Sequence, residues 1–197
     1  AILEFDFIPT GDTLRFRYVF GSEEYPEYVC DIFNDAFGFF LSGPGINGPF
    51  SNNAKNIALI PSTTVPITIN TVNSGSPGGF NDATTCASAD PNWVNNSIYY
   101  VDNGTGTTVV YDGFTTVLTA FSLVECGQLY HIKLAIGDGG DSSFDSAVFL
   151  EAGSFTSAGE VTATLTGGTG LNGTDLVEGC GPWDFVFTRV GELDQDV

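Results

Sequence analysis

The chain has 197 residues, of which 42% are hydrophobic and 17 are phenylalanine, so it has enough apolar side chain for one large buried core. Five lysine and arginine residues against 24 aspartate and glutamate residues give a formal net charge of −19 at pH 7. This charge excludes nucleic acid and anionic lipid as expected partners, because both are bound through a basic face. No apolar run approaches the roughly 18 residues that a membrane-spanning helix needs, so we expect no direct membrane insertion.

The chain starts inside a strand-like segment, residues 1–7, and contains no methionine. Both features lead us to expect a piece of a larger protein whose targeting and anchoring segments lie elsewhere. Its expected partners then include other modules of the same polypeptide.

Short runs rich in β-branched and aromatic residues recur along the chain, with turn sequences such as Asn103-Gly104 and Asp112-Gly113 between them. No stretch has the apolar period of a long amphipathic helix. These runs predict an all-β fold, a two-sheet β-sandwich of jelly-roll-like type. The predicted strands are residues 2–7, 13–20, 36–41, 56–60, 67–72, 97–101, 107–111, 115–122, 129–137, 146–152, 161–165 and 183–189.

A first acidic stretch, residues 21–35, follows the second predicted strand. With almost no lysine or arginine nearby, its carboxylates repel one another unless a cation lies among them. Hard cations such as calcium (Ca²⁺) prefer clustered oxygen ligands of this kind, whereas the alternative is a solvated loop. The candidate metal ligands here are Glu23, Glu24, Asp31, Asn34 and Asp35.

Two long polar loops, residues 43–55 and 73–96, separate the middle strands. Loops of this length in a compact domain are usually functional or held by a cross-link. Trp93 lies in the second loop, so it is a candidate for stacking on a bound ligand, and its alternative role is to fix the loop to the core. Tyr25 and Tyr99 are the other candidate ligand-binding aromatic residues.

A second acidic stretch, residues 137–146, precedes the strand at 146–152. Asp138, Asp141 and Asp145 lie on a glycine-rich wrap that resembles a calcium loop, although no helices flank it. The alternative is an ordinary hairpin turn. The sequence leaves open whether the two acidic stretches share one ion or hold one each.

The composition changes near residue 157, where we place a domain boundary. Residues 1–157 form the predicted sandwich. Residues 158–197 are predicted to be a linker and the first strands of a following small β-module.

The four cysteines are even in number and form no Cys-x-x-Cys pair, which favours disulfides in an oxidising compartment over a zinc site. Three pairings are possible, and the sequence does not choose among them. The cysteines are Cys30, Cys86, Cys126 and Cys180.

The chain has a single histidine, His131, which alternates with apolar neighbours in a predicted strand and is expected to be an ordinary residue of the strand face. No nucleophile-elbow motif accompanies it. A pair of carboxylates from the two acidic stretches would suit a glycoside hydrolase, but acids this crowded indicate compensation by a cation rather than an acid and a base.

Several strings resemble the choice-of-anchor L domain of large secreted bacterial surface proteins, many of them from Bacteroidetes. They lie in order over nearly all of residues 1–157. They are Tyr18-Val19-Phe20-Gly21-Ser22-Glu23-Glu24-Tyr25, Phe33-Asn34-Asp35-Ala36-Phe37-Gly38-Phe39-Phe40, and residues 56–61, 69–73, 111–120, 130–136 and 149–155. The resemblance implies a module of a long exported protein, held at the cell surface by a separate anchor and engaged in adhesion.

Together the residues and the resemblance predict a non-catalytic, extracellular adhesion module of a bacterial cell-surface protein, stabilised by calcium in its acidic loops. One alternative is a calcium-dependent carbohydrate- or peptide-binding module, whose ligand would be a surface glycan or a protein. Others are the subunit of a surface filament or array, and, least favoured, a glycoside hydrolase.

Overall fold

The computed structural model describes residues 1–79, 81–106, 109–140, 143–157, 160–166 and 184–190, the last two ranges by their backbone. Three short helical segments, η1 (Ser51–Asn53), α1 (Ala83–Ala89) and η2 (Trp93–Tyr99), lie between strands. The strands are β1 (Ile2–Phe7), β2 (Thr13–Ser22), β3 (Ala36–Ser42), β4 (Lys55–Asn56), β5 (Tyr100–Asp102), β6 (Gly113–Thr115), β7 (Leu118–Leu123), β8 (Tyr130–Gly137), β9 (Ser146–Leu150), β10 (Glu160–Thr166) and β11 (Asp184–Val190).

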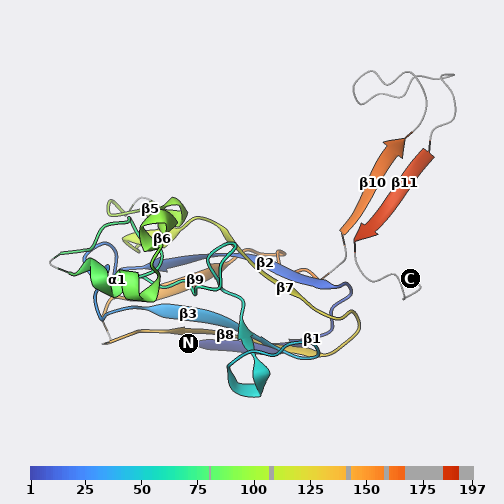
Figure 1. Cartoon of the computed structure of the whole chain (residues 1–197), viewed down its shortest axis with the longest axis horizontal. Coiled ribbons are helices and arrows are strands. Elements are labelled where there is room, and N and C mark those ends of the chain that lie inside the picture. The colour runs from blue at the N-terminus through green and yellow to red at the C-terminus, as the bar shows by residue number, and fades with distance from the viewer. Residues whose placement is uncertain (80, 107–108, 141–142, 158–159, 167–183, 191–197) are drawn as a thin grey trace.

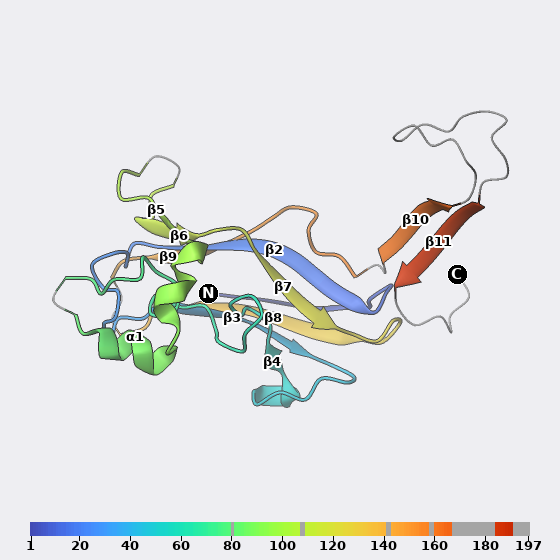
Figure 2. The ribbon, with the colours of Figure 1, turned by 45° about the horizontal axis from the view of Figure 1, so that its top comes forward.

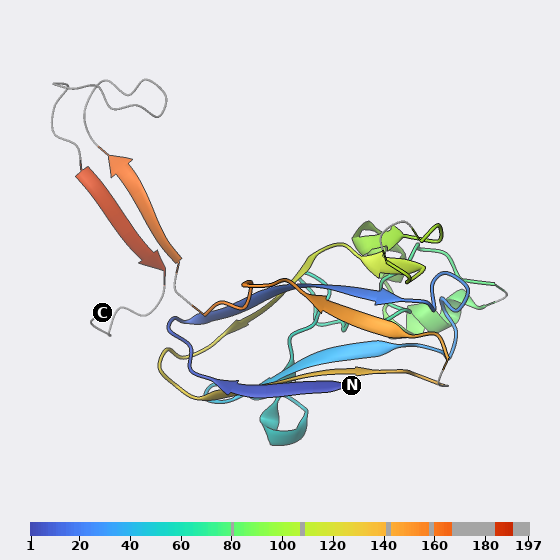
Figure 3. The same cartoon turned by 180° about the vertical axis from the view of Figure 1, so that it is seen from behind.

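Two antiparallel sheets lie face to face (Figures 1 and 3). Sheet A has the strand order β1-β8-β3-β4, and sheet B has the order β5-β6-β2-β7 with β9 on the other edge of β2. Strand β2 is ten residues long, so it pairs with β7 over residues 13–18 and with β9 over residues 18–22. The predicted all-β, two-sheet sandwich is confirmed.

The core lies between the sheets and is built mainly from aromatic rings. Alternate residues of β2 are buried, among them Phe16, Tyr18 and Phe20, and they meet Phe37 and Phe39 of β3. The ring centroids of Phe16 and Tyr18 lie 5.0 and 4.9 Å from that of Phe39. Burial of each such side chain contributes roughly 1.5–3 kcal/mol. The alternation seen in the sequence therefore decides which face of β2 points inward.

Three predicted strands differ in the structure. Of residues 56–60 only Asn56 lies in a strand, and residues 109–111 of the predicted strand 107–111 are bends. Residues 67–72 are mostly turns, with one isolated bridge at Thr68. The Thr68 N–H donates to Thr71 Oγ1 at 2.9 Å, and the Thr71 hydroxyl donates to the Pro66 carbonyl at 2.8 Å. Threonine side chains that bond nearby backbone in this way compete with a strand ladder. The β-branched run 67–72 therefore has the composition of a strand without the conformation of one.

The second long loop contains helical turns that the sequence did not predict. Helix α1 begins after Asp82, whose carboxylate accepts a hydrogen bond from the Thr84 N–H at 2.9 Å. The predicted strand 97–101 is divided between the end of η2 and the start of β5. Both helical segments are seven residues long, too short for an apolar period to reveal them.

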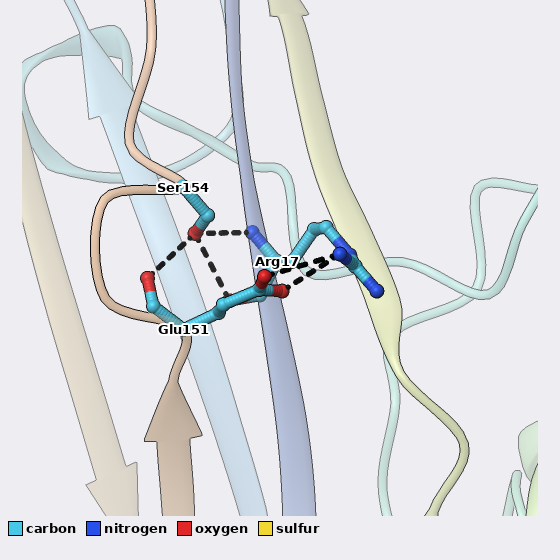
Figure 4. Close-up of polar contacts among 3 residues, drawn as sticks. All are labelled: Arg17, Glu151 and Ser154. Atoms are coloured by element: carbon cyan, nitrogen blue, oxygen red, sulfur yellow. Dashed lines mark hydrogen bonds and ion pairs between the residues drawn. The ribbon is translucent and has the colours of Figure 1, made fainter.

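Beyond β9 the chain turns and continues along β2. The Arg17 guanidinium forms an ion pair with Glu151 at 3.0 Å, and the Arg17 N–H donates to Ser154 Oγ at 2.9 Å (Figure 4). Two backbone hydrogen bonds then join Arg15 to Thr156 at 3.0 and 2.9 Å. The sandwich therefore extends along β2 to residue 156.

Strands β10 and β11 form a separate antiparallel sheet, drawn beyond one end of the sandwich in Figure 2. Residues 158–159, 167–183 and 191–197 of the predicted second module lie outside the described residues, and the boundary near residue 157 stays a prediction. Within the described ranges, none of the helices has the length and apolar character required to cross a membrane.

Candidate functional site

The two acidic stretches lie next to each other, and Asp35 joins them. Its carboxylate is buried, with Oδ1 accepting a hydrogen bond from the Gly139 N–H at 2.9 Å and Oδ2 accepting one from the Ser146 hydroxyl at 2.6 Å. Both donors belong to the second stretch. A buried carboxylate needs such donors, because hydrogen bonds to a charged acceptor offset part of its desolvation cost.

Backbone contacts complete this junction. The Asn34 N–H donates to the Gly139 carbonyl at 2.9 Å, and the Glu23 N–H donates to the Asp145 carbonyl at 3.1 Å. A Cβ atom on Gly139 would lie 2.6 Å from the Asn34 carbonyl oxygen, so the close approach of the two stretches requires glycine there. The stretches are therefore held together by hydrogen bonds through Asp35, Asn34 and Glu23.

The other candidate metal ligands point to different surroundings. Glu24 is buried, and the Asp31 carboxylate accepts a hydrogen bond from the N–H of the next residue, Ile32, at 2.6 Å. Asp138 and Asp145 are exposed, and Asp141 lies outside the described residues. In the part of the chain that the structure describes, no three histidine, cysteine, aspartate or glutamate side chains gather as a metal site would require. The calcium site stays a prediction.

The first acidic stretch is also fixed to the second long loop, through the disulfide Cys30–Cys86. Beside it the buried Asn70 accepts a hydrogen bond from the Cys30 N–H at 2.7 Å and donates one to the Asp31 carbonyl at 2.8 Å. Cys126 is half-buried and carries a free thiol, and Cys180 lies outside the described residues. The structure thus fixes Cys86 as the partner of Cys30, a choice that the sequence left open.

Buried polar side chains hold the second long loop from within. The Asn96 amide donates to Asp90 Oδ2 and to the Thr71 carbonyl, both at 2.8 Å. The Asn73 amide donates to the Ile69 carbonyl at 2.9 Å. The sequence analysis missed this network because asparagine is common in exposed loops, and nothing in the chain shows which asparagines become buried.

The candidate ligand-binding aromatic residues lie largely in the interior. Tyr25 is fully buried and its hydroxyl donates to the Val72 carbonyl at 2.5 Å, while Trp93 is buried where η2 packs on the core. Tyr99 is half-buried against the same core. The rings of Tyr25 and Trp93 are therefore not available to stack on a ligand. Trp93 instead fixes the loop, which is the alternative that the sequence left open.

A further polar cluster lies on the outer face of sheet A, where β1 pairs with β8. His131 Nδ1 lies 2.7 Å from Asp6 Oδ1, and Lys133 Nζ lies 2.9 Å from Glu4 Oε2. The hydrogen bond and the positive charge of Lys133 lower the pKa of the Glu4 carboxyl. His131 is thus a residue of the strand face, as expected. In the sequence, acids occupy alternate positions of residues 2–7 and basic residues occupy alternate positions of residues 129–137. Each pattern marks a polar strand face, but neither shows that the two strands pair.

Comparison with known proteins identifies the sandwich. Residues 1–156 match the choice-of-anchor L domain, a non-catalytic type of surface module. No curated protein and no solved structure matches the chain. The match covers both acidic stretches, the disulfide and the outer face of sheet A, and it ends where the chain leaves β2. The chain therefore belongs to the choice-of-anchor L domain family, whose members are secreted or surface-associated.

Proposed function

We propose that this extracellular module is non-catalytic and belongs to a larger exported protein, whose adhesion to other surfaces it mediates. The observation that carries the proposal is the loop-rich end of the sandwich, where α1, β5 and β6 gather (Figure 1). There η2 buries Trp93 and Asn96 on one side and exposes Val94 and Ile98 on the other, with exposed fractions of 50% and 72%. Exposed aliphatic side chains on a rigid support are typical of a contact surface.

The rigidity of this end supports the same proposal. Three segments meet at this end: the two acidic stretches and the second long loop. They are fixed to one another by the Cys30–Cys86 disulfide and the buried Asp35 carboxylate, and the long loop is held from within by its buried amide network. A surface that is already ordered loses little conformational entropy when it binds. We further propose that calcium bound near Asp138, Asp141 and Asp145 stabilises this end, since oxygen ligands on turns are what Ca²⁺ prefers.

Adhesion can be measured with fluorescent beads that carry the whole chain, on surfaces coated with mucin or with gelatin. We expect retention above that of albumin-coated beads on at least one surface. Ile98→Asp should lower it at least fivefold, because a charge at the contact must be desolvated. The matched control is Leu123→Asp, at a side chain 66% exposed at the end of β7 in sheet B. Retention equal to albumin, or an equal loss in both variants, contradicts the proposal.

A filament or array subunit is the second candidate, favoured by the open edge of sheet A. Among the strands that the structure describes, β1 pairs only with β8. A hollow of about 190 Å³ beside it is lined by apolar residues, including Leu3, Ile136 and Leu150. Exposed apolar edge strands of this kind pair readily with other chains. The native particle mass in solution distinguishes the two candidates, since a filament subunit grows in mass with concentration whereas an adhesion module does not.

A further inference from the structure

The segment around η1 folds over the outer face of sheet A (Figures 1 and 2). The side chains between them leave this face hollowed. Two cavities of about 240 and 250 Å³ adjoin there and share Ser42, Asn52 and His131. Small-ligand sites usually occupy about 300–1,000 Å³, a size that the two reach together. The sheet A site is defined here as Phe40, Ser42, Phe50, Asn52, His131 and Lys133.

Strand register orders the side chains of this face into two rows. Strand β8 pairs with β1 on one edge and with β3 on the other. Residues directly opposite each other in a sheet project to the same face, so each row presents three neighbouring side chains. The rows are Asp6–His131–Ser42 and Glu4–Lys133–Phe40.

Within each row an acidic side chain faces a nitrogen-bearing one. Asp6 faces His131, and Glu4 faces Lys133, with side chains between 40% and 62% exposed. Ion pairs this exposed contribute little to stability, so stability alone does not account for them. Each acid retains acceptor lone pairs and Lys133 retains N–H donors, while the face has no excess of positive charge to attract an anion. Such a surface suits a neutral ligand that both donates and accepts hydrogen bonds.

An aromatic surface lies beside these rows. Phe50 is 46% exposed, and its ring packs edge-on against Phe40 with the centroids 4.7 Å apart. Asn52 and Asn53 follow with φ of 59° and 56°, in a turn closed by the Ala54 N–H donating to the Ser51 carbonyl at 3.2 Å. Two consecutive left-handed residues define a turn type that favours asparagine, and the turn places Asn52 at both cavities.

We propose that the sheet A site binds a neutral oligosaccharide. The phenylalanine pair packs against the C–H face of one sugar ring, and the Asp6–His131 pair, the Glu4–Lys133 pair and Asn52 hydrogen-bond its hydroxyl groups. The inference rests on the proposed function, because it gives the adhesion module a second contact, besides the exposed side of η2, through which it holds glycans of the surface it adheres to. A peptide suits the site less well, since β8 is paired on both edges and has no free backbone groups to add a strand to.

Affinity electrophoresis of the whole chain, in native gels that contain dextran, mannan, galactomannan or xyloglucan, tests the inference. We expect at least one of these neutral polysaccharides to retard the chain. Phe50→Ala and Lys133→Ala should each weaken the retardation at least tenfold while the melting temperature stays within a few degrees. The matched control is Phe121→Ala, whose ring is 50% exposed on β7 of sheet B, and it should migrate as the unaltered chain does.

Three results would overturn the inference. They are the absence of retardation by every neutral polysaccharide, retardation by acidic alginate alone, and an equal loss in Phe121→Ala and Phe50→Ala. The bead assay separates this failure from that of the proposed function. Beads that adhere while no polysaccharide retards the chain leave adhesion standing through another surface, such as the exposed side of η2.

Discussion

At the residue scale, Asp35 is the side chain that links the two acidic stretches. Both of its oxygens accept hydrogen bonds from the second stretch, and the carboxylate is buried. Asp35→Ala should lower the free energy of unfolding by about 3 kcal/mol, because it leaves the partly buried Gly139 N–H and Ser146 hydroxyl without this acceptor. Asp35→Asn should cost less, since an amide oxygen can still accept from Gly139. Urea denaturation measures both changes.

The matched control for Asp35 is Asp31→Ala in the same stretch. Asp31 is half-buried and its carboxylate accepts a bond from the adjacent Ile32, so we expect a loss below about 1 kcal/mol. Similar losses in Asp31→Ala and Asp35→Ala would show that acidity in the stretch, rather than the link through Asp35, sets its stability.

At the element scale, the disulfide fixes α1, which η2 contacts, to the first acidic stretch. Cys30 and Cys86 are 56 positions apart, so the bond closes a long loop that the unfolded chain would otherwise leave open. Replacing both cysteines by alanine should cost about 2–5 kcal/mol. Proteolysis should then begin within residues 73–99, because the buried amide network there has lost its covalent support. Cys126→Ser, at the free thiol, should change neither stability nor the cleavage sites appreciably.

At the scale of the whole molecule, a net charge of −19 disfavours the folded state through self-repulsion, and bound calcium would relieve it. Extracellular calcium sites have dissociation constants of about 0.1–1 mM. For a value near 0.1 mM, 10 mM Ca²⁺ adds about 2.7 kcal/mol. We expect the melting temperature to rise by roughly 5–10 °C relative to EGTA-treated protein, as measured by calorimetry.

Two controls separate calcium binding from screening of charge. Mg²⁺ and NaCl at matched ionic strength should reproduce only a small part of the increase, since screening does not distinguish the cations. Asp141→Asn combined with Asp145→Asn should abolish the calcium-specific part, whereas Glu125→Gln, an exposed acid near the β7–β8 turn, should retain it. An increase that is the same for all three salts excludes a specific site.

The sequence by itself determined the sandwich and most of its strands. In β2 the rings of Phe16 and Tyr18 stand two positions apart, and in β3 so do those of Phe37 and Phe39. Each pair therefore lies on one face of its strand, the face that is buried in the core, because a strand has a period of two residues. The family resemblance was readable for the same reason, because its matching strings are mostly strands and the turns between them. The run 67–72 shows the limit of this logic, since its composition is that of a strand while its threonines bond their own backbone.

Only the tertiary structure decided which distant residues meet. It brought Asp35 to Gly139 and Ser146, selected Cys86 as the partner of Cys30, and buried Trp93 and Tyr25. It also aligned Glu4 and Asp6 with Lys133 and His131 on one outer face. These outcomes depend on strand order and on contacts between residues more than a hundred positions apart or in irregular loops. A local pattern carries no information about such contacts, because the free energy that selects them arises from packing of the whole chain.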